Sequence, residues 1–208
     1  MKRILVIVLI LFSVTSEAQM LLNPYRHTSS VPFVADSIKI HFYSGSNAVG
    51  GNWNSVNGTT ALTNLKWFSD GSNSGATGTL SAQSSVADHA VGYCPSPVFN
   101  WPQGVLRYTS SHSATRTFTI SSLPAGTYQV RLVATRSTQA VTQTYSIAGS
   151  TSSNNTIAVG SNCGADDALF TDISVSDGGS IVITATNTSN GNNYFTAMVV
   201  TRVSNTLP

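Results

Sequence analysis

Few side chains in this sequence are suited to catalysis. Hydrolases need an acid, a base or a nucleophile in a tuned environment, and glycosidases usually use two carboxyl groups. The only glutamate is Glu17, and most of the seven aspartates adjoin Gly, Asn or Ser, where turn and cap roles are usual. Asp88 and His89 are adjacent, so on a strand they would face opposite ways, and no Gly-x-Ser-x-Gly motif is present. We therefore expect no enzymatic activity.

Metal-ligand patterns are equally sparse. Residues 70–75 place oxygen-bearing side chains two apart, as in a calcium loop, but Ser81 occupies the position of the closing glutamate of an EF-hand. A plain Gly-Asn turn is the alternative. The four histidines lack metal-ligand spacing, so no metal site is predicted. A structural calcium ion held by Asp166, Asp167 or Asp172 stays open.

Aromatic residues in loop-like sequence are the best candidates for ligand binding. Trp53 lies between Asn52 and Asn54 in a Gly- and Asn-rich stretch, and Trp101 also lies in loop-like sequence. An indole can cover the apolar face of a sugar ring while amides hydrogen-bond its hydroxyl groups. The alternative for Trp53 is a loop plug packed on the domain. Trp67 has strand spacing and is expected in the core.

The first 18 residues are predicted to be a secretory signal peptide. Lys2 and Arg3 precede the apolar run 4–12, and Ser16 and Ala18 are the small residues that a cleavage site requires. The run is shorter than the roughly 20 residues of a membrane span, so no span is expected. Cleavage after Ala18 would export the chain to the periplasm, the cell surface or the medium.

Charge is low and almost balanced. Charged residues make up 9% of the chain, and removing the signal leaves 8 basic and 7 acidic side chains. No Lys/Arg cluster remains that could follow a phosphate backbone, so nucleic acid is not an expected partner. Neutral partners suit this composition best.

Cys94 and Cys163 are the only cysteines. An exported protein meets an oxidising compartment, where two cysteines tend to pair, so we expect a disulfide. Two buried free thiols are the alternative. Two cysteines in two loops cannot form a zinc site alone.

Alternating apolar and polar residues predict many short strands and no long helix. Residues 19–36 lack this alternation and contain two prolines, so they are expected to form an extended N-terminal arm before a domain at 37–208. Residues 121–126 are expected to link a hairpin, and 81–103 a long loop with short strand pieces. The expected fold is an all-β antiparallel β-sandwich. The strands are expected at residues 38–43, 62–68, 77–80, 116–120, 127–136, 143–148, 156–159, 168–175, 180–186 and 194–203.

The order of features over about half of the mature chain is more specific. It runs from Trp101-Pro102 through residues 118–128 and Thr135-Arg136 to the segments 145–149 and 177–179. This order resembles the galactose-binding-like, carbohydrate-binding-module-like β-sandwich domains of secreted and surface bacterial proteins. The resemblance implies a jelly roll that binds glycans through loops at one end or a concave face, sometimes with structural calcium. Arg136 matches a recurrent feature of such modules, which makes it a candidate ligand contact, and the alternative is that it braces a loop.

Two functions follow as expectations. The first is a secreted, non-catalytic module that binds neutral carbohydrate or cell-surface polysaccharide through Trp53, its flanking asparagines, Trp101 and Arg136. The second is a structural or adhesive subunit of an extracellular assembly. In that case residues 19–36 would pair with the sheet edge of a neighbour and mediate self-association.

Overall fold

The computed structural model describes residues 35–43, 49, 51–88, 101–136, 141–159, 167–186, 188 and 190–205. The predicted signal peptide, nearly all of the predicted arm, Cys94 and Cys163 lie outside these residues. Cleavage after Ala18, the role of residues 19–36 and the disulfide therefore stay predictions. No helix in the described segments is long and apolar enough to cross a membrane.

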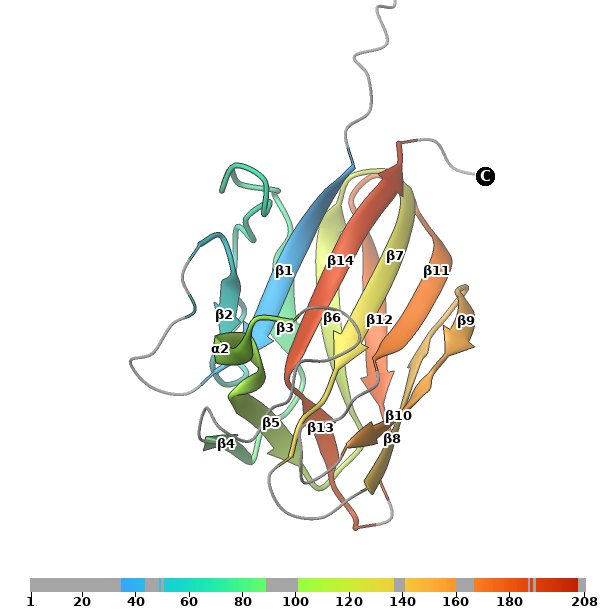
Figure 1. Cartoon of the computed structure of the whole chain (residues 1–208). Helices are drawn as coiled ribbons and strands as arrows, with labels where there is room; N and C mark the ends of the chain where they lie inside the picture. Colours follow the sequence, from blue (N-terminus) through green and yellow to red (C-terminus); the bar gives the residue numbers. More distant parts are fainter. Residues whose placement is uncertain are drawn as a thin grey trace, which may run out of the picture. The chain divides into compact units, whose positions relative to one another are not determined.

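The described residues form an all-β structure of largely antiparallel sheets packed together (Figure 1). The six-stranded sheet has the order β2 (Asn54–Val56), β1 (Asp36–Phe42), β14 (Ala197–Ser204), β7 (Gly126–Val133), β11 (Ala168–Val175) and β9 (Thr151–Asn154). The five-stranded sheet has the order β10 (Thr156–Val159), β8 (Val141–Ile147), β12 (Gly179–Ala185), β6 (Arg116–Leu123) and β3 (Thr77–Leu80). A three-stranded sheet contains β13 (Asn193–Phe195), β5 (Tyr108–His112) and β4 (Ser85–Asp88), and one short helix, α2, spans Gln103–Leu106.

The main core lies between the two large sheets. Side chains alternate along each strand, so every second residue of the two facing sheets enters the same apolar layer. Phe42 of β1 contacts Phe118 of β6 edge to face at 5.3 Å, which joins the two sheets directly, and it stacks on Phe195 at 5.2 Å. Ile38, Ile40 and Phe42 are fully buried, as the alternation of apolar and polar residues in the predicted strand 38–43 requires.

The connection between β6 and β7 corrects one expectation. Residues 121–126 do not close a hairpin, because β6 pairs with β12 and β3 while β7 pairs with β14 and β11. The chain instead crosses from one sheet to the other. At the start of β7, a Cβ on Gly126 would lie 2.3 Å from the carbonyl oxygen of Ser204, so only glycine fits there. Turn residues show that the chain reverses, but they do not show which strand the returning segment will pair with.

Residues 62–68 were expected to form a strand, and this expectation is wrong. They form an irregular loop with isolated bridges from Leu62 to Gly78 and from Lys66 to Asn73. Trp67 of this loop is partly buried against the main core, close to its expected place. Asn64 has a left-handed φ of +58°, which interrupts the extended conformation that a regular strand requires.

A second apolar cluster covers part of the outer face of the six-stranded sheet. On this face, residues of β7 and β14 contact α2 and the segment before it. Trp53 and Val49 pack against the cluster. Residues 81–103 were expected to form a long loop with short strand pieces, and their described part contains β4 and the start of α2. The buried members of this cluster are Trp101, Val105, Leu106, Val133, Ala197 and Val199.

Candidate functional site

Five aromatic rings form a continuous row beside β1, which we call the aromatic row. Its members are, in order, Tyr108, Tyr43, His41, Trp53 and Phe68. Successive ring centroids are 5.6, 5.7, 6.1 and 6.2 Å apart. His41 and Tyr108 are buried, whereas Tyr43, Trp53 and Phe68 keep part of their surface exposed. The row therefore presents a partly exposed aromatic surface on a buried base.

The pleat of β1 and its pairing explain how the row forms. Because Ile40 and Phe42 face the main core, His41 must point to the opposite side of the sheet. The parallel pairing of β2 with β1 places Asn54 opposite Ile40, which brings the preceding Trp53 beside His41. The main-chain nitrogen of Phe68 donates to the carbonyl oxygen of Ser37 at 2.8 Å, and this fixes the far end of the row.

A cation lies at each end of the row. The Nζ atom of Lys39 is 3.3 Å from the ring centroid of Phe68 and 5.8 Å from that of Trp53. Burial lowers the pKa of this amine. At the other end the Arg107 guanidinium is 5.2 Å from the Tyr108 ring centroid and forms an ion pair with Asp88 at 2.6 Å. The positive charges are thus held on ring faces or neutralised.

His41 is fully buried beneath the row. Its Nε2 atom lies 2.7 Å from Ser55 Oγ, while Nδ1 has no hydrogen-bond partner among the described residues. Burial lowers the pKa of His41 to about 4, so the ring is neutral at pH 7. The histidine of a Ser-His-Asp triad is oriented by a carboxylate at Nδ1. Among the described residues, His41 therefore packs within the aromatic row and bonds Ser55, and no carboxylate orients its ring.

The side chains of the two asparagines beside Trp53 form hydrogen bonds with main-chain groups. Asn54 is buried, and its Nδ2 donates to the carbonyl oxygens of Lys39 and Lys66 at 3.0 and 3.1 Å, while its Oδ1 accepts from the Lys66 nitrogen at 2.8 Å. Asn52 Nδ2 donates to the Phe68 carbonyl oxygen at 3.0 Å. Both amides therefore position Trp53, and each was predicted as a ligand contact.

Replacing Asn54 by alanine should lower the free energy of unfolding by about 1–3 kcal/mol, because it removes three partly buried hydrogen bonds to the main chain of Lys39 and Lys66. Urea unfolding of the variant and the parent measures this. Asn57→Ala is the matched control, since Asn57 is exposed directly after β2, and the stability of this variant should match that of the parent. Equal stability of Asn54→Ala and Asn57→Ala would contradict the positioning role.

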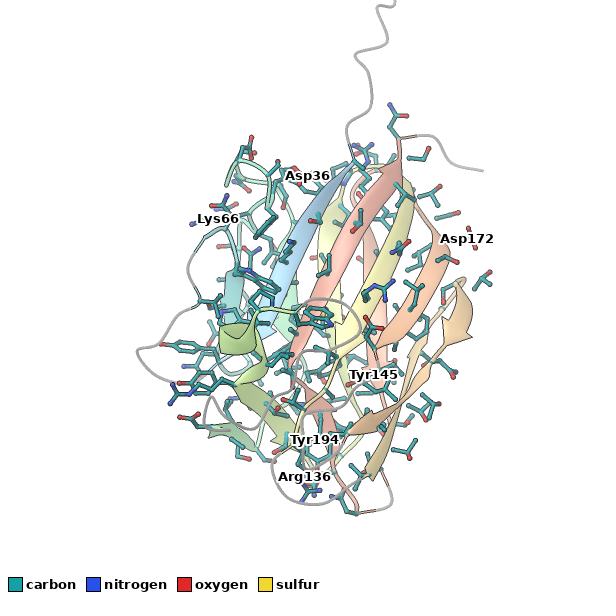
Figure 2. All side chains as sticks on the ribbon, in the orientation of Figure 1. Asp36, Lys66, Arg136, Tyr145, Asp172 and Tyr194 are labelled. Carbon is teal, nitrogen blue, oxygen red and sulfur yellow. The ribbon has the colours of Figure 1, made fainter. Side chains whose placement is uncertain are left out.

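The other two predicted ligand contacts lie in different surroundings. Trp101 is only 3% exposed and belongs to the second apolar cluster, against which Trp53 packs. The Arg136 guanidinium is 5.3 Å from the ring centroid of Tyr194, near the end of the sheets shown in Figure 2. In the described part of the chain no ring contact joins Arg136 to the aromatic row. The structure thus places Trp53 against the cluster that contains Trp101, and Arg136 is not a member of that cluster.

Three described aspartates that were considered as calcium ligands have partners within the protein. Asp70 Oδ1 accepts from the Ser72 nitrogen at 2.8 Å, which makes residues 70–75 a turn closed by its own side chains. Asp167 forms an ion pair with Arg131 at 2.8 Å, and Asp172 accepts from Thr171 Oγ1 at 2.8 Å. Asp166 lies outside the described residues. Over the ranges that the structure describes, no three His, Cys, Asp or Glu side chains gather as a metal site would require.

Sequence reasoning missed most of the row. His41 and Tyr43 alternate with the buried residues of β1, so a second apolar face was visible in the sequence. Phe68 and Tyr108 carried no comparable signal, because their places depend on contacts between distant segments.

No protein-family model, no curated protein and no solved structure matches this chain.

Proposed function

We propose that this chain is a non-catalytic binding module and that a neutral carbohydrate binds on the aromatic row. The observation that carries the proposal is the partly exposed surface of Tyr43, Trp53 and Phe68 in one continuous row. Pyranose rings have apolar C–H faces that aromatic side chains cover well. Successive rings offer a sugar chain several adjacent contacts.

The rigidity of the row favours binding. Trp53 contacts His41 and Phe68 at interplanar angles of 89° and 75°, and it also packs on the second apolar cluster. A ring that is already fixed loses little conformational freedom when a ligand arrives. The carbohydrate would therefore meet a preformed surface.

The charges near the row support a neutral ligand over an acidic one. Arg107 is paired with Asp88, and the Lys39 amine lies against the Phe68 ring, where burial lowers its pKa. An acidic sugar would have to compete with Asp88 for Arg107. A neutral sugar has no such competition.

We also propose the fold family of the protein and its location in the cell. The galactose-binding-like jelly roll is supported by the two large, largely antiparallel sheets that pack on one core. The predicted signal peptide supports secretion, or display in the periplasm or at the cell surface. A glycan on the outside of the cell would then be accessible to the row.

The test begins with the full mature chain on an array of neutral and acidic glycans. Titrations with the best ligand then compare the parent with Trp53→Leu, which keeps apolar packing but removes the aromatic face. We expect Trp53→Leu to bind about 5- to 150-fold more weakly, as when an anchor worth about 1–3 kcal/mol is lost. Trp67→Leu is the matched control, because Trp67 packs on the main core, and it should bind as the parent does.

Two results would overturn the proposal. One is equal affinity of Trp53→Leu and the parent for every glycan bound. The other is an array without a hit, together with a concentration-dependent oligomer that is lost when residues 19–36 are deleted. The second result would favour the structural or adhesive subunit.

A further inference from the structure

The sequence contains two Asn-Gly dipeptides, Asn57-Gly58 and Asn190-Gly191. In such a pair the glycine nitrogen can attack the asparagine side-chain carbonyl, because glycine has no side chain to obstruct the approach. Both glycines have a left-handed conformation, with φ of +82° and +78°. A Cβ on either would meet nothing within 4 Å, so the two pairs do not differ in steric access.

The pair Asn190-Gly191 is held in place by hydrogen bonds. Asn190 Oδ1 accepts from Thr188 Oγ1 and from the Asn192 nitrogen at 3.2 Å, and its Nδ2 donates to the Tyr194 hydroxyl at 2.9 Å. The Gly191 nitrogen donates to the Thr188 carbonyl oxygen at 2.9 Å. The reaction there must first break most of these bonds.

The pair Asn57-Gly58 is much freer. Asn57 is exposed directly after β2, and its side chain has no hydrogen bond among the described residues. The Gly58 nitrogen donates to Gln83 Oε1 at 3.2 Å, and that oxygen also accepts from Ser110 Oγ at 3.2 Å. One long bond to a shared side-chain oxygen is a weak restraint compared with the bonds at Asn190.

We propose that Asn57 is a site of spontaneous modification, where asparagine is converted into aspartate and isoaspartate. The Gly58 nitrogen loses its proton to solvent base and forms a bond to Cγ of Asn57. The bond from Cγ to the side-chain nitrogen breaks, and that nitrogen takes up a proton and leaves as ammonia. Water then opens the resulting succinimide ring at either carbonyl. No oxidant or reductant takes part.

The modification changes the edge of the six-stranded sheet next to the aromatic row. Both products add a negative charge after β2, and isoaspartate also lengthens the main chain by one methylene group. Asn54 is the first residue of this short strand, and Trp53 directly precedes it.

The experiment incubates the full mature chain in mildly alkaline buffer and follows both dipeptides by peptide mapping and mass spectrometry. A parallel incubation in urea gives the intrinsic rate of each pair. Relative to these intrinsic rates, we expect native Asn57 to react at least about tenfold faster than native Asn190, because several hydrogen bonds restrain only Asn190. Asn57→Gln should abolish the acidic isoform that ion exchange resolves.

Equal ratios of native to intrinsic rate at the two sites would overturn the proposal. So would a native Asn57 that keeps its amide over a time in which it reacts fully in urea. An acidic isoform that persists in Asn57→Gln would place the reaction elsewhere and would equally refute it.

Discussion

Replacing Arg116 by alanine is expected to lower the free energy of unfolding by about 3–5 kcal/mol, because acceptors buried around the guanidinium lose their donor. Arg116 is 1% exposed at the start of β6, and burial lowers its pKa to about 10, so it remains charged at pH 7. It donates to Asn193 Oδ1, to the Ser110 carbonyl oxygen and, at 2.8 Å, to Ser110 Oγ. It also donates to the Ala82 carbonyl oxygen at 3.1 Å.

These bonds join different sheets. Ser110 belongs to β5 and Asn193 to β13, so Arg116 fastens the three-stranded sheet to the five-stranded one. Lysine at this position should restore little of the stability, because an ammonium group cannot reach several acceptors in the planar geometry of a guanidinium.

Chemical denaturation of Arg116→Ala, Arg116→Lys and Arg107→Ala measures the effect. Arg107 is the matched control, since its ion pair with Asp88 is partly exposed and screened by solvent, so its loss should change stability little. Similar losses in Arg116→Ala and Arg107→Ala would show that the buried network does not stabilise the fold.

Acidification should destabilise the fold through His41, by up to about 3 kcal/mol between pH 6.5 and pH 4. The unfolded chain takes up a proton at this ring near its ordinary pKa of 6.5, whereas the buried ring does so only near 4. Between these values the unfolded state binds more protons, so stability falls as the pH falls. The contribution is complete above the unfolded pKa and levels off below the folded one.

Urea unfolding at several pH values tests this, with the parent compared with His41→Gln. Glutamine keeps a polar contact for Ser55 but does not titrate, so the variant should lose most of the pH dependence in this window while starting from a lower stability. His112→Gln is the control, because His112 is only partly buried and bonds the nearby Ala114 nitrogen. A parent whose stability is constant from pH 6.5 to 4 would contradict the buried neutral ring.

Much of the strand pattern could be predicted because the alternation of side chains is local. The strands at 156–159 and 168–175 have the expected bounds. Within the predicted strand 127–136, every second residue is buried, namely Tyr128, Val130, Leu132 and Ala134. The predicted strand at 194–203 divides into β13 and β14 at Thr196, whose hydroxyl is engaged by Thr109 and the Thr135 nitrogen. This break depends on residues far away in the sequence and has no local signature.

By itself, the sequence determined the all-β class and which face of most strands enters the core, because a period of two arises within each strand. It also limited the kinds of functional site that the chain can form, because folding can only bring together side-chain types that the sequence contains. Tertiary structure alone decided that β6 and β7 lie in different sheets, because strand pairing joins segments that are distant in the chain. It also decided that His41, Trp53 and Phe68 meet, because the parallel pairing of β2 with β1 and one main-chain bond from Phe68 bring three separate segments together.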